Sequence, residues 1–88
     1  MLGLKELIQV FVHIKDEKEM KQLFHEIFTE KERETLSDRW LLMKEIHNNT
    51  PQRKIAEKFH MSLCKITRGA KVLHEKKSIC KKILDAKN

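Results

Sequence analysis

Four consecutive apolar residues, Trp40-Leu41-Leu42-Met43, stand in the middle of a segment that otherwise has the composition of a solvated helix. An α-helix has about 3.6 residues per turn, so these four side chains point in directions that span a full turn. A single buried face cannot take up all four. A helix here therefore needs apolar cover on more than one side, and in a chain of 88 residues the natural second cover is another copy of the chain. We expect an obligate homodimer.

The rest of the chain has the composition and spacing of a single all-α domain. It contains two Gly and one Pro, and its apolar residues recur three or four positions apart. Thr29 and Glu32 have the spacing of a capping box. Thr50-Pro51 reads as an N-cap followed by proline at the first helical position, and Ser62 as a further N-cap. These signals predict about six helices, over residues 4–14, 20–27, 30–47, 51–59, 62–73 and 78–86.

Several classes of protein are excluded by what the sequence lacks. No apolar run approaches the roughly 20 residues that a membrane span needs, and the first residues do not have the basic-then-apolar pattern of a signal peptide. Cys64 and Cys80 do not make a disulfide framework, and His60 with Cys64 does not make a metal-binding pattern. The chain has no phosphate loop, nucleophile elbow or apolar carboxylate pair. We therefore expect a cytoplasmic protein that holds no metal and is not an enzyme.

The two halves of the chain differ in charge. Residues 1–50 carry eight basic and ten acidic side chains, whereas residues 51–88 carry eleven basic and three acidic ones, a net of +8. A basic half beside a nearly neutral half indicates a scaffold joined to a surface that binds a polyanion, most commonly nucleic acid. An acidic protein partner and a merely solvated basic face are alternatives. Membrane binding is disfavoured, because the basic residues do not lie opposite a large aromatic face.

Residues 52–71 have the pattern of a helix-turn-helix. Such a motif needs an apolar residue, then a small residue where its helices cross, then apolar residues on both sides of the turn and inside the second helix. These positions are filled by Ile55, Ala56, Phe59, Met61 and Ile66. His60 stands where glycine is usual, because the turn favours a left-handed backbone, which histidine tolerates better than most residues. A two-helix corner used only for packing fits the same pattern.

The polar positions of this motif suit a DNA duplex. The second helix of a helix-turn-helix enters the major groove, where phosphate contacts position the protein and base contacts select the sequence. We expect Lys65 and Thr67 to contribute most to sequence selection. The residues expected at double-stranded DNA are Gln52, Arg53, Lys54, Lys58, Ser62, Leu63, Cys64, Lys65, Thr67 and Lys71.

Three blocks of sequence, in one order, resemble the tryptophan repressor family. They are Thr29–Arg39, Gln52-Arg53 and Ile66-Thr67-Arg68-Gly69, and the similarity covers roughly residues 28–73. The resemblance implies a small, intertwined, all-helical homodimer that binds a palindromic operator when its corepressor L-tryptophan is present. On this interpretation the chain divides into a dimerisation scaffold (1–49), a helix-turn-helix (50–73) and a C-terminal helix (74–88).

The resemblance also implies a tryptophan site between the long central helix and the second motif helix. Two arginines sandwich the indole in this family, a threonine lies near the ligand carboxylate, and a glycine and an aliphatic residue lie beside the ring. Backbone carbonyls of two residues from the partner subunit meet the ligand ammonium. The matching positions are, in that order, Arg39 and Arg68, Thr29, Gly69 and Met43, and the carbonyls of Glu26 and Phe28.

The chemistry of these residue types agrees with that assignment. A guanidinium is planar, stacks on aromatic faces and forms two parallel hydrogen bonds to a carboxylate, so two arginines suit an anionic aromatic ligand. Gly69 inside a helix costs about 1 kcal/mol relative to alanine, and the close approach of a ligand is one reason to keep it. The plainer alternatives are an exposed helix arginine at Arg39 and a DNA phosphate contact at Arg68.

Val72 departs from the family pattern. It lies one turn after Arg68, where tryptophan repressors carry a serine whose hydroxyl bonds the polar end of the ligand. A lost hydrogen bond is worth about 0.5–1.5 kcal/mol, or roughly three- to tenfold in affinity. Weaker tryptophan binding, another aromatic ligand, and a constitutive DNA-binding protein that has lost tryptophan sensing all remain open.

Overall fold

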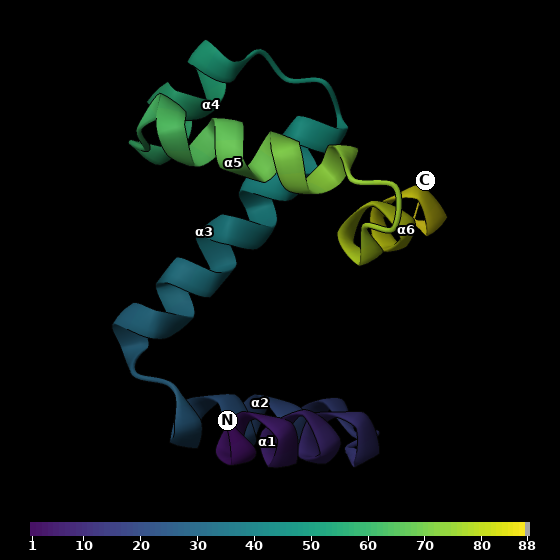
Figure 1. Ribbon diagram of the computed structural model, residues 1–88. Helices are drawn as coiled ribbons and strands as arrows, with labels where there is room; N and C mark the ends of the chain where they lie inside the picture. The colour runs from purple at the N-terminus through teal and green to yellow at the C-terminus, as the bar shows by residue number, and fades with distance from the viewer. Residues whose placement is uncertain (88) are drawn as a thin grey trace. The chain divides into compact units, whose positions relative to one another are not determined.

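The computed structural model describes residues 1–87 and is all-helical over that range (Figure 1). Its helices are α1 (Leu2–His13), α2 (Glu17–Ile27), α3 (Glu30–His47), α4 (Gln52–Phe59), α5 (Leu63–His74) and α6 (Ile79–Ala86). The predicted all-α class with six helices is therefore confirmed for the described residues. The chain forms two compact units, Met1–Glu34 and a second unit from Thr35 onward, and α3 begins in the first and continues into the second.

Side-chain caps begin four of the helices, the first being α2, where Asp16 Oδ1 accepts from the backbone N–H of Lys18 at 3.3 Å. The backbone N–H of Glu32 donates to Thr29 Oγ1 (3.1 Å) and the backbone N–H of Thr29 donates to Glu32 Oε1 (2.8 Å), which confirms the predicted capping box. Ser62 Oγ accepts from the backbone N–H of Lys65 at 3.4 Å, so its predicted N-cap is also present. Ser78 caps α6 in the same way.

The N-cap predicted at Thr50 is wrong. Pro51 is the N-cap of α4 and makes no side-chain cap bond, and its carbonyl accepts the first helical hydrogen bond, from Ile55 N–H at 3.1 Å. Thr50 instead donates its hydroxyl to Glu45 Oε2 at 2.7 Å. Glu45, near the end of α3, is therefore the partner of the hydroxyl that was predicted to cap α4.

The first unit is a pair of helices, α1 and α2, that lie side by side (Figure 1) and bury no residue. They meet through aromatic rings: Phe11 stacks on Phe24 at a centroid distance of 5.4 Å, and Phe24 lies 5.1 Å from Phe28. Many apolar side chains of this unit stay exposed, among them Leu2, Leu4, Ile8, Val10, Val12 and Ile27. A pair of helices with this much exposed apolar surface is not stable alone in water.

The core of the second unit joins α3 to the helix-turn-helix. Ile55 of α4 and Ile66 of α5 are both 0% exposed, and they pack with Leu42 of α3. The half-buried residues against this cluster are Ile46, Ala56, Phe59 and Met61. Of the five apolar positions predicted for the motif, Ile55 and Ile66 thus belong to the core, and the other three pack against it.

The turn of the motif has the predicted backbone. His60 lies in the left-handed region, with φ 53° and ψ 41°, and its N–H donates to the Ala56 carbonyl. Histidine here carries the steric cost that glycine would avoid. Hydrogen bonds and core packing therefore stabilise this turn, since its residue type does not favour the left-handed backbone.

Gly69 lies at the point where α5 packs against α3. A Cβ added there would lie 3.1 Å from Ile46 Cδ1 and 3.5 Å from Leu42 Cδ2, both on α3. The predicted reason for this glycine, close approach of a ligand, is thus joined by a second one from within the chain. Because α5 lacks a side chain at this point, it lies close against α3, as Figure 1 shows for the two ribbons.

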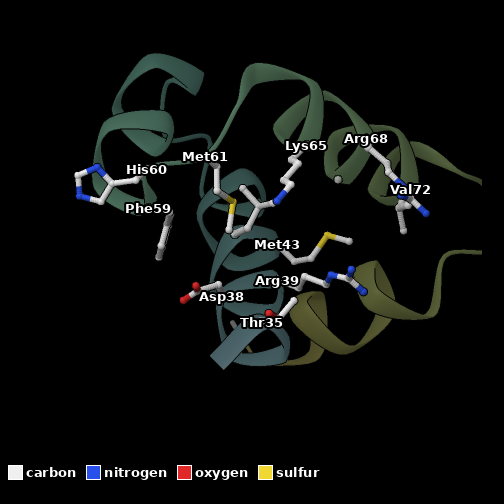
Figure 2. A pocket seen from close by; sticks show the side chains of 12 residues that line it. Thr35, Asp38, Arg39, Met43, Phe59, His60, Met61, Lys65, Arg68 and Val72 are labelled. Carbon is white, nitrogen blue, oxygen red and sulfur yellow. The ribbon is translucent and has the colours of Figure 1, made fainter. Parts of the chain in front are cut away.

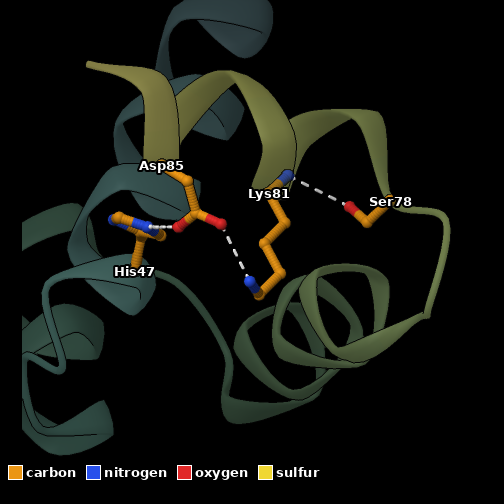
Figure 3. Close-up of polar contacts among 4 residues, drawn as sticks. All are labelled: His47, Ser78, Lys81 and Asp85. Atoms are coloured by element: carbon orange, nitrogen blue, oxygen red, sulfur yellow. Dashed lines mark hydrogen bonds and ion pairs between the residues drawn. The ribbon is translucent and has the colours of Figure 1, made fainter. Parts of the chain in front are cut away.

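The helix α6 packs against α5, and a polar cluster joins it to the end of α3. Leu84 is buried, and His47 Nε2 lies 2.7 Å from Asp85 Oδ1, a hydrogen bond in which the carboxylate accepts (Figure 3). Lys81 Nζ donates to the other oxygen of Asp85 at 2.8 Å. The hydrogen bonds from Lys81 and His47 hold the pKa of Asp85 below its usual value.

The apolar run Trp40–Met43 is only partly covered by its own chain. Leu42 is 5% exposed and belongs to the core, whereas Leu41, its neighbour, is 40% exposed. Trp40 and Met43 are half-buried. Part of this apolar run, on the sides of α3 that face away from the helix-turn-helix, therefore remains exposed to solvent.

We expect the core to be far more sensitive than the outer surface to the same substitution. Leu42→Ala should lower the free energy of unfolding by about 2–5 kcal/mol, because it leaves a cavity between α3 and the motif. Leu63→Ala, at a leucine that is 58% exposed on α5, should change it by less than about 1 kcal/mol. Urea unfolding at one fixed protein concentration measures both. Equal losses would contradict the core described here.

Candidate functional site

A cavity of about 430 Å³ lies between α3, the turn of the helix-turn-helix and α5 (Figure 2). Pockets that hold small ligands typically measure roughly 300–1,000 Å³. Its lining residues are Thr35, Asp38, Arg39, Leu42, Met43, Phe59, His60, Met61, Lys65, Arg68, Gly69 and Val72. The cavity thus lies beside the helix that carries the predicted DNA contacts.

Several residues predicted for a tryptophan site line this cavity. Arg39 and Met43 come from α3, and Arg68, Gly69 and Val72 from α5. Figure 2 shows Arg39, Arg68 and Val72 toward one end of the cavity, with Met43 between the two helices. Val72 presents two methyl groups there and no hydroxyl.

The remaining predicted ligand residues belong to the first unit and are not among the lining residues. Thr29 Oγ1 accepts a hydrogen bond in the capping box, which leaves its hydroxyl hydrogen available as a donor. The Phe28 carbonyl accepts from Arg33 Nη1 at 2.6 Å, and the side chain of Glu26 accepts from Gln22 at 3.0 Å. A carbonyl has two lone pairs, so the bond from Arg33 still leaves Phe28 one acceptor position.

Sequence reasoning missed more than half of the cavity wall. Thr35 and Asp38 precede Arg39 on α3, and Phe59, His60 and Met61 come from the turn. Helical spacing was the signal that could have found Thr35, because it lies four residues, or about one turn, before Arg39. Phe59 and Met61 were predicted to pack in the motif, and they do pack against its core as well as line the cavity.

The predicted DNA-contacting residues lie on the outer surface of the motif. All ten are exposed, from Gln52, Arg53, Lys54 and Lys58 on α4 to Ser62, Leu63, Cys64, Lys65, Thr67 and Lys71 at the turn and on α5. Lys65 lines the cavity as well, and Figure 2 shows its side chain extending from α5 toward α3. One side chain therefore belongs to both the cavity wall and the outer helix surface.

Lys58 is held by its own chain. Its Nζ lies 2.7 Å from Glu45 Oε1 and 5.5 Å from the centre of the Phe59 ring. The hydrogen bonds from Lys58 and Thr50 hold the pKa of Glu45 below its usual value. This pair ties the first motif helix to the end of α3.

Residues 1–87 contain no group of His, Cys, Asp or Glu side chains that could hold a metal ion. None of the helices described is long and apolar enough to cross a membrane. The Cys64 and Cys80 thiols are free.

The helix-turn-helix with its basic outer surface defines the class: a DNA-binding protein with a small cavity behind its second motif helix. Residues 3–88 match the model of the Trp repressor protein family, and the chain belongs to that family. No curated protein and no solved structure gives a significant match. The family is one of DNA-binding transcription regulators, so the chain is a tryptophan-repressor-like regulator and not an enzyme.

We expect the bond between Glu45 and Lys58 to appear in the pH dependence of stability. Because the pKa of Glu45 is lowered in the folded state, its contribution is full above the unfolded value near 4.5 and is lost as the pH falls through the folded value. Glu45→Gln should therefore be less stable at pH 7 and should lose less stability between pH 7 and pH 4. Urea unfolding across this range tests it, with the exposed Glu57→Gln on α4 as the control. Parallel curves for wild type and Glu45→Gln would contradict the prediction.

Proposed function

We propose that this protein is a transcriptional repressor that binds a palindromic operator as a homodimer, with L-tryptophan as its corepressor. The observation that carries the proposal is the cavity behind α5. Residues that match the family's ligand-binding positions on α3 and α5 line that one space, directly behind the helix that carries the predicted base contacts.

The two arginines supply the chemistry for this ligand. Arg39 and Arg68 lie toward the same end of the cavity, and a guanidinium both stacks on an indole and pairs with a carboxylate. Leu42, Met43 and Met61 give the cavity an apolar wall. An aromatic ring with one anionic end matches this combination.

In this proposal the ligand shifts the equilibrium between conformations of the two motif helices. Without it, the motif helices sample positions that do not fit two successive major grooves. A ring bound between α3 and α5 favours the conformation in which the two reading helices of a dimer match half-sites about one helical turn apart, near 34 Å. The carbonyls of Glu26 and Phe28 and the hydroxyl of Thr29 would complete the ligand site in the dimer, as the family resemblance implies.

The homodimer is supported by apolar surface that the chain leaves open. Leu4, Ile8 and Val12 of α1 are exposed, as are Leu36 and Leu41 of α3. A surface of this kind marks an interface, and a second copy would bury it. The folded unit in solution is then the dimer, whose stability rises with protein concentration.

Val72 favours a second candidate function, a DNA-binding protein that no longer responds to tryptophan. It lines the cavity where the family has a serine hydroxyl for the ligand's polar end. The loss of one hydrogen bond lowers affinity by roughly three- to tenfold, which weakens a site with two arginines without abolishing it. Tryptophan sensing with reduced affinity therefore stands as the first proposal.

Calorimetric titration with L-tryptophan tests the ligand. We expect saturation at one ligand per subunit, no binding by Arg68→Ala, and three- to tenfold tighter binding by Val72→Ser, since it restores a hydroxyl at the polar end of the ligand. Lys71→Ala is the matched control, because it removes a cation from the same helix outside the cavity. Absence of heat up to millimolar tryptophan would leave the constitutive DNA-binding protein as the function.

Selection of duplexes from a random pool tests the DNA partner. We expect a two-fold symmetric sequence that binds more tightly with tryptophan, with an affinity that falls steeply as salt rises, because bound lysines and arginines release counterions from phosphates. Thr67→Ala should relax the preference at particular base pairs, whereas Lys54→Ala should weaken all duplexes alike. Equal affinity with and without tryptophan would remove its role as corepressor.

A further inference from the structure

We propose that Lys65 couples the cavity to the DNA: its side chain extends into the empty cavity and moves out to a DNA phosphate when a ligand takes the space between α3 and α5. This inference rests on the proposed function, because it concerns the same cavity. It gives Lys65 a part in the response to the ligand, which neither the sequence motifs nor the family match assigns to this residue.

The backbone of Lys65 is fixed, and only its side chain is placed to move. Lys65 lies in the first turn of α5, and its N–H donates to Oγ of Ser62, the N-cap of the helix, at 3.4 Å. Arg68 and Gly69 follow about one turn later, so all three residues lie on one side of α5 and line the cavity. Figure 2 shows the Lys65 side chain extending from α5 toward α3. The residue is nevertheless exposed, which places it at the mouth of the cavity.

Among residues 1–87, no bond holds the Lys65 ammonium at the cavity. Nζ of Lys58 lies 2.7 Å from Glu45 Oε1, whereas Nζ of Lys65 has no ion pair or hydrogen bond in the described part of the chain. A lysine stem lies readily along apolar surface while its ammonium stays in water, and the wall offers it Leu42 and Met61. The four-carbon stem is flexible, so the ammonium can leave the cavity without a change in the backbone.

A bound ligand makes the inward position of Lys65 unfavourable. In the proposed function, Arg39 and Arg68 take the ring and the carboxylate of the ligand, and the ring fills the space between the helices that Lys65 enters. Asp38 is the one acid among the lining residues, and Lys65 forms no ion pair with it in the part of the chain described. An ammonium enclosed beside the ring therefore loses water without gaining an anionic partner, which is costly. Outside the cavity, on the surface that carries the predicted DNA contacts, it meets water and phosphates.

This movement gives Lys65 opposite effects on ligand binding and on DNA binding. In the free protein its side chain competes with the aromatic ligand for the cavity, so its removal strengthens ligand binding. In the DNA complex its charge faces a phosphate, so its removal weakens DNA binding. Removal of a lysine that only contacts DNA would leave ligand binding unchanged, and removal of one that binds the ligand directly would weaken it. The signs of the two changes together therefore identify the role of Lys65.

The experiment measures both affinities for the full chain and for two variants. Lys65→Ala removes the side chain from the cavity, and Lys71→Ala removes a cation of the same helix that does not line it. L-tryptophan is titrated calorimetrically in the absence of DNA. The two-fold symmetric duplex obtained from the random pool is then titrated with saturating tryptophan at several salt concentrations, and fluorescence anisotropy reports its binding. Circular dichroism verifies that each variant is folded.

We expect Lys65→Ala to bind tryptophan about two- to fivefold more tightly than the wild type, the range for the weak contacts of an exposed charged side chain. Its affinity for the duplex should fall, and the slope of log K against log salt should become shallower by about 0.9 per subunit, as for one lost phosphate contact. Lys71→Ala should weaken duplex binding alone.

Unchanged or weaker tryptophan binding by Lys65→Ala would overturn the inference and leave the proposed function intact, as would an unchanged affinity for the duplex. Absence of tryptophan binding to the wild type would overturn both.

Discussion

The close packing of α5 on α3 is the contact on which the rest of the second unit depends. Gly69 allows it, because any side chain there would meet Ile46 and Leu42. On one side of this contact, Ile66 and Ile55 complete the core of the helix-turn-helix. On the other, the diverging side chains of the two helices enclose the cavity. Packing and binding thus share one pair of helices, so a ligand between them acts directly on the helix that carries the predicted base contacts.

Polar contacts near the end of α3 hold the neighbouring elements in place. Glu45 binds Lys58 and Thr50, which fixes α4, and His47 binds Asp85, which fixes α6. In each ion pair one partner, Lys58 or Asp85, is at least half exposed, so each pair contributes little stability by itself. Their effect is to orient the neighbouring helices. This matters because a helix-turn-helix must meet the DNA major groove at a definite angle.

The sequence predicted the motif well and the cavity only in part. Ile55, Ile66 and the capping box of Thr29 were found because they depend on local spacing, which a linear pattern records. The Thr50 cap was wrong because α4 has Pro51 as its N-cap, and the Thr50 hydroxyl donates to Glu45 on another helix. Asp38 was missed for a similar reason: nothing in its neighbours along the chain indicates which side of α3 faces α5.

The sequence by itself determined the class of fold, the helix-turn-helix and the family, because helical periodicity, caps and the blocks around Arg39 and Arg68 are local features. Only the tertiary structure decided that Gly69 serves helix packing, that Lys65 lines the cavity as well as the outer surface, and that Asp38 lies in the same cavity wall. Those properties depend on how α3 and α5 approach each other. That approach is set by the side chains of both helices together, and no single segment specifies it.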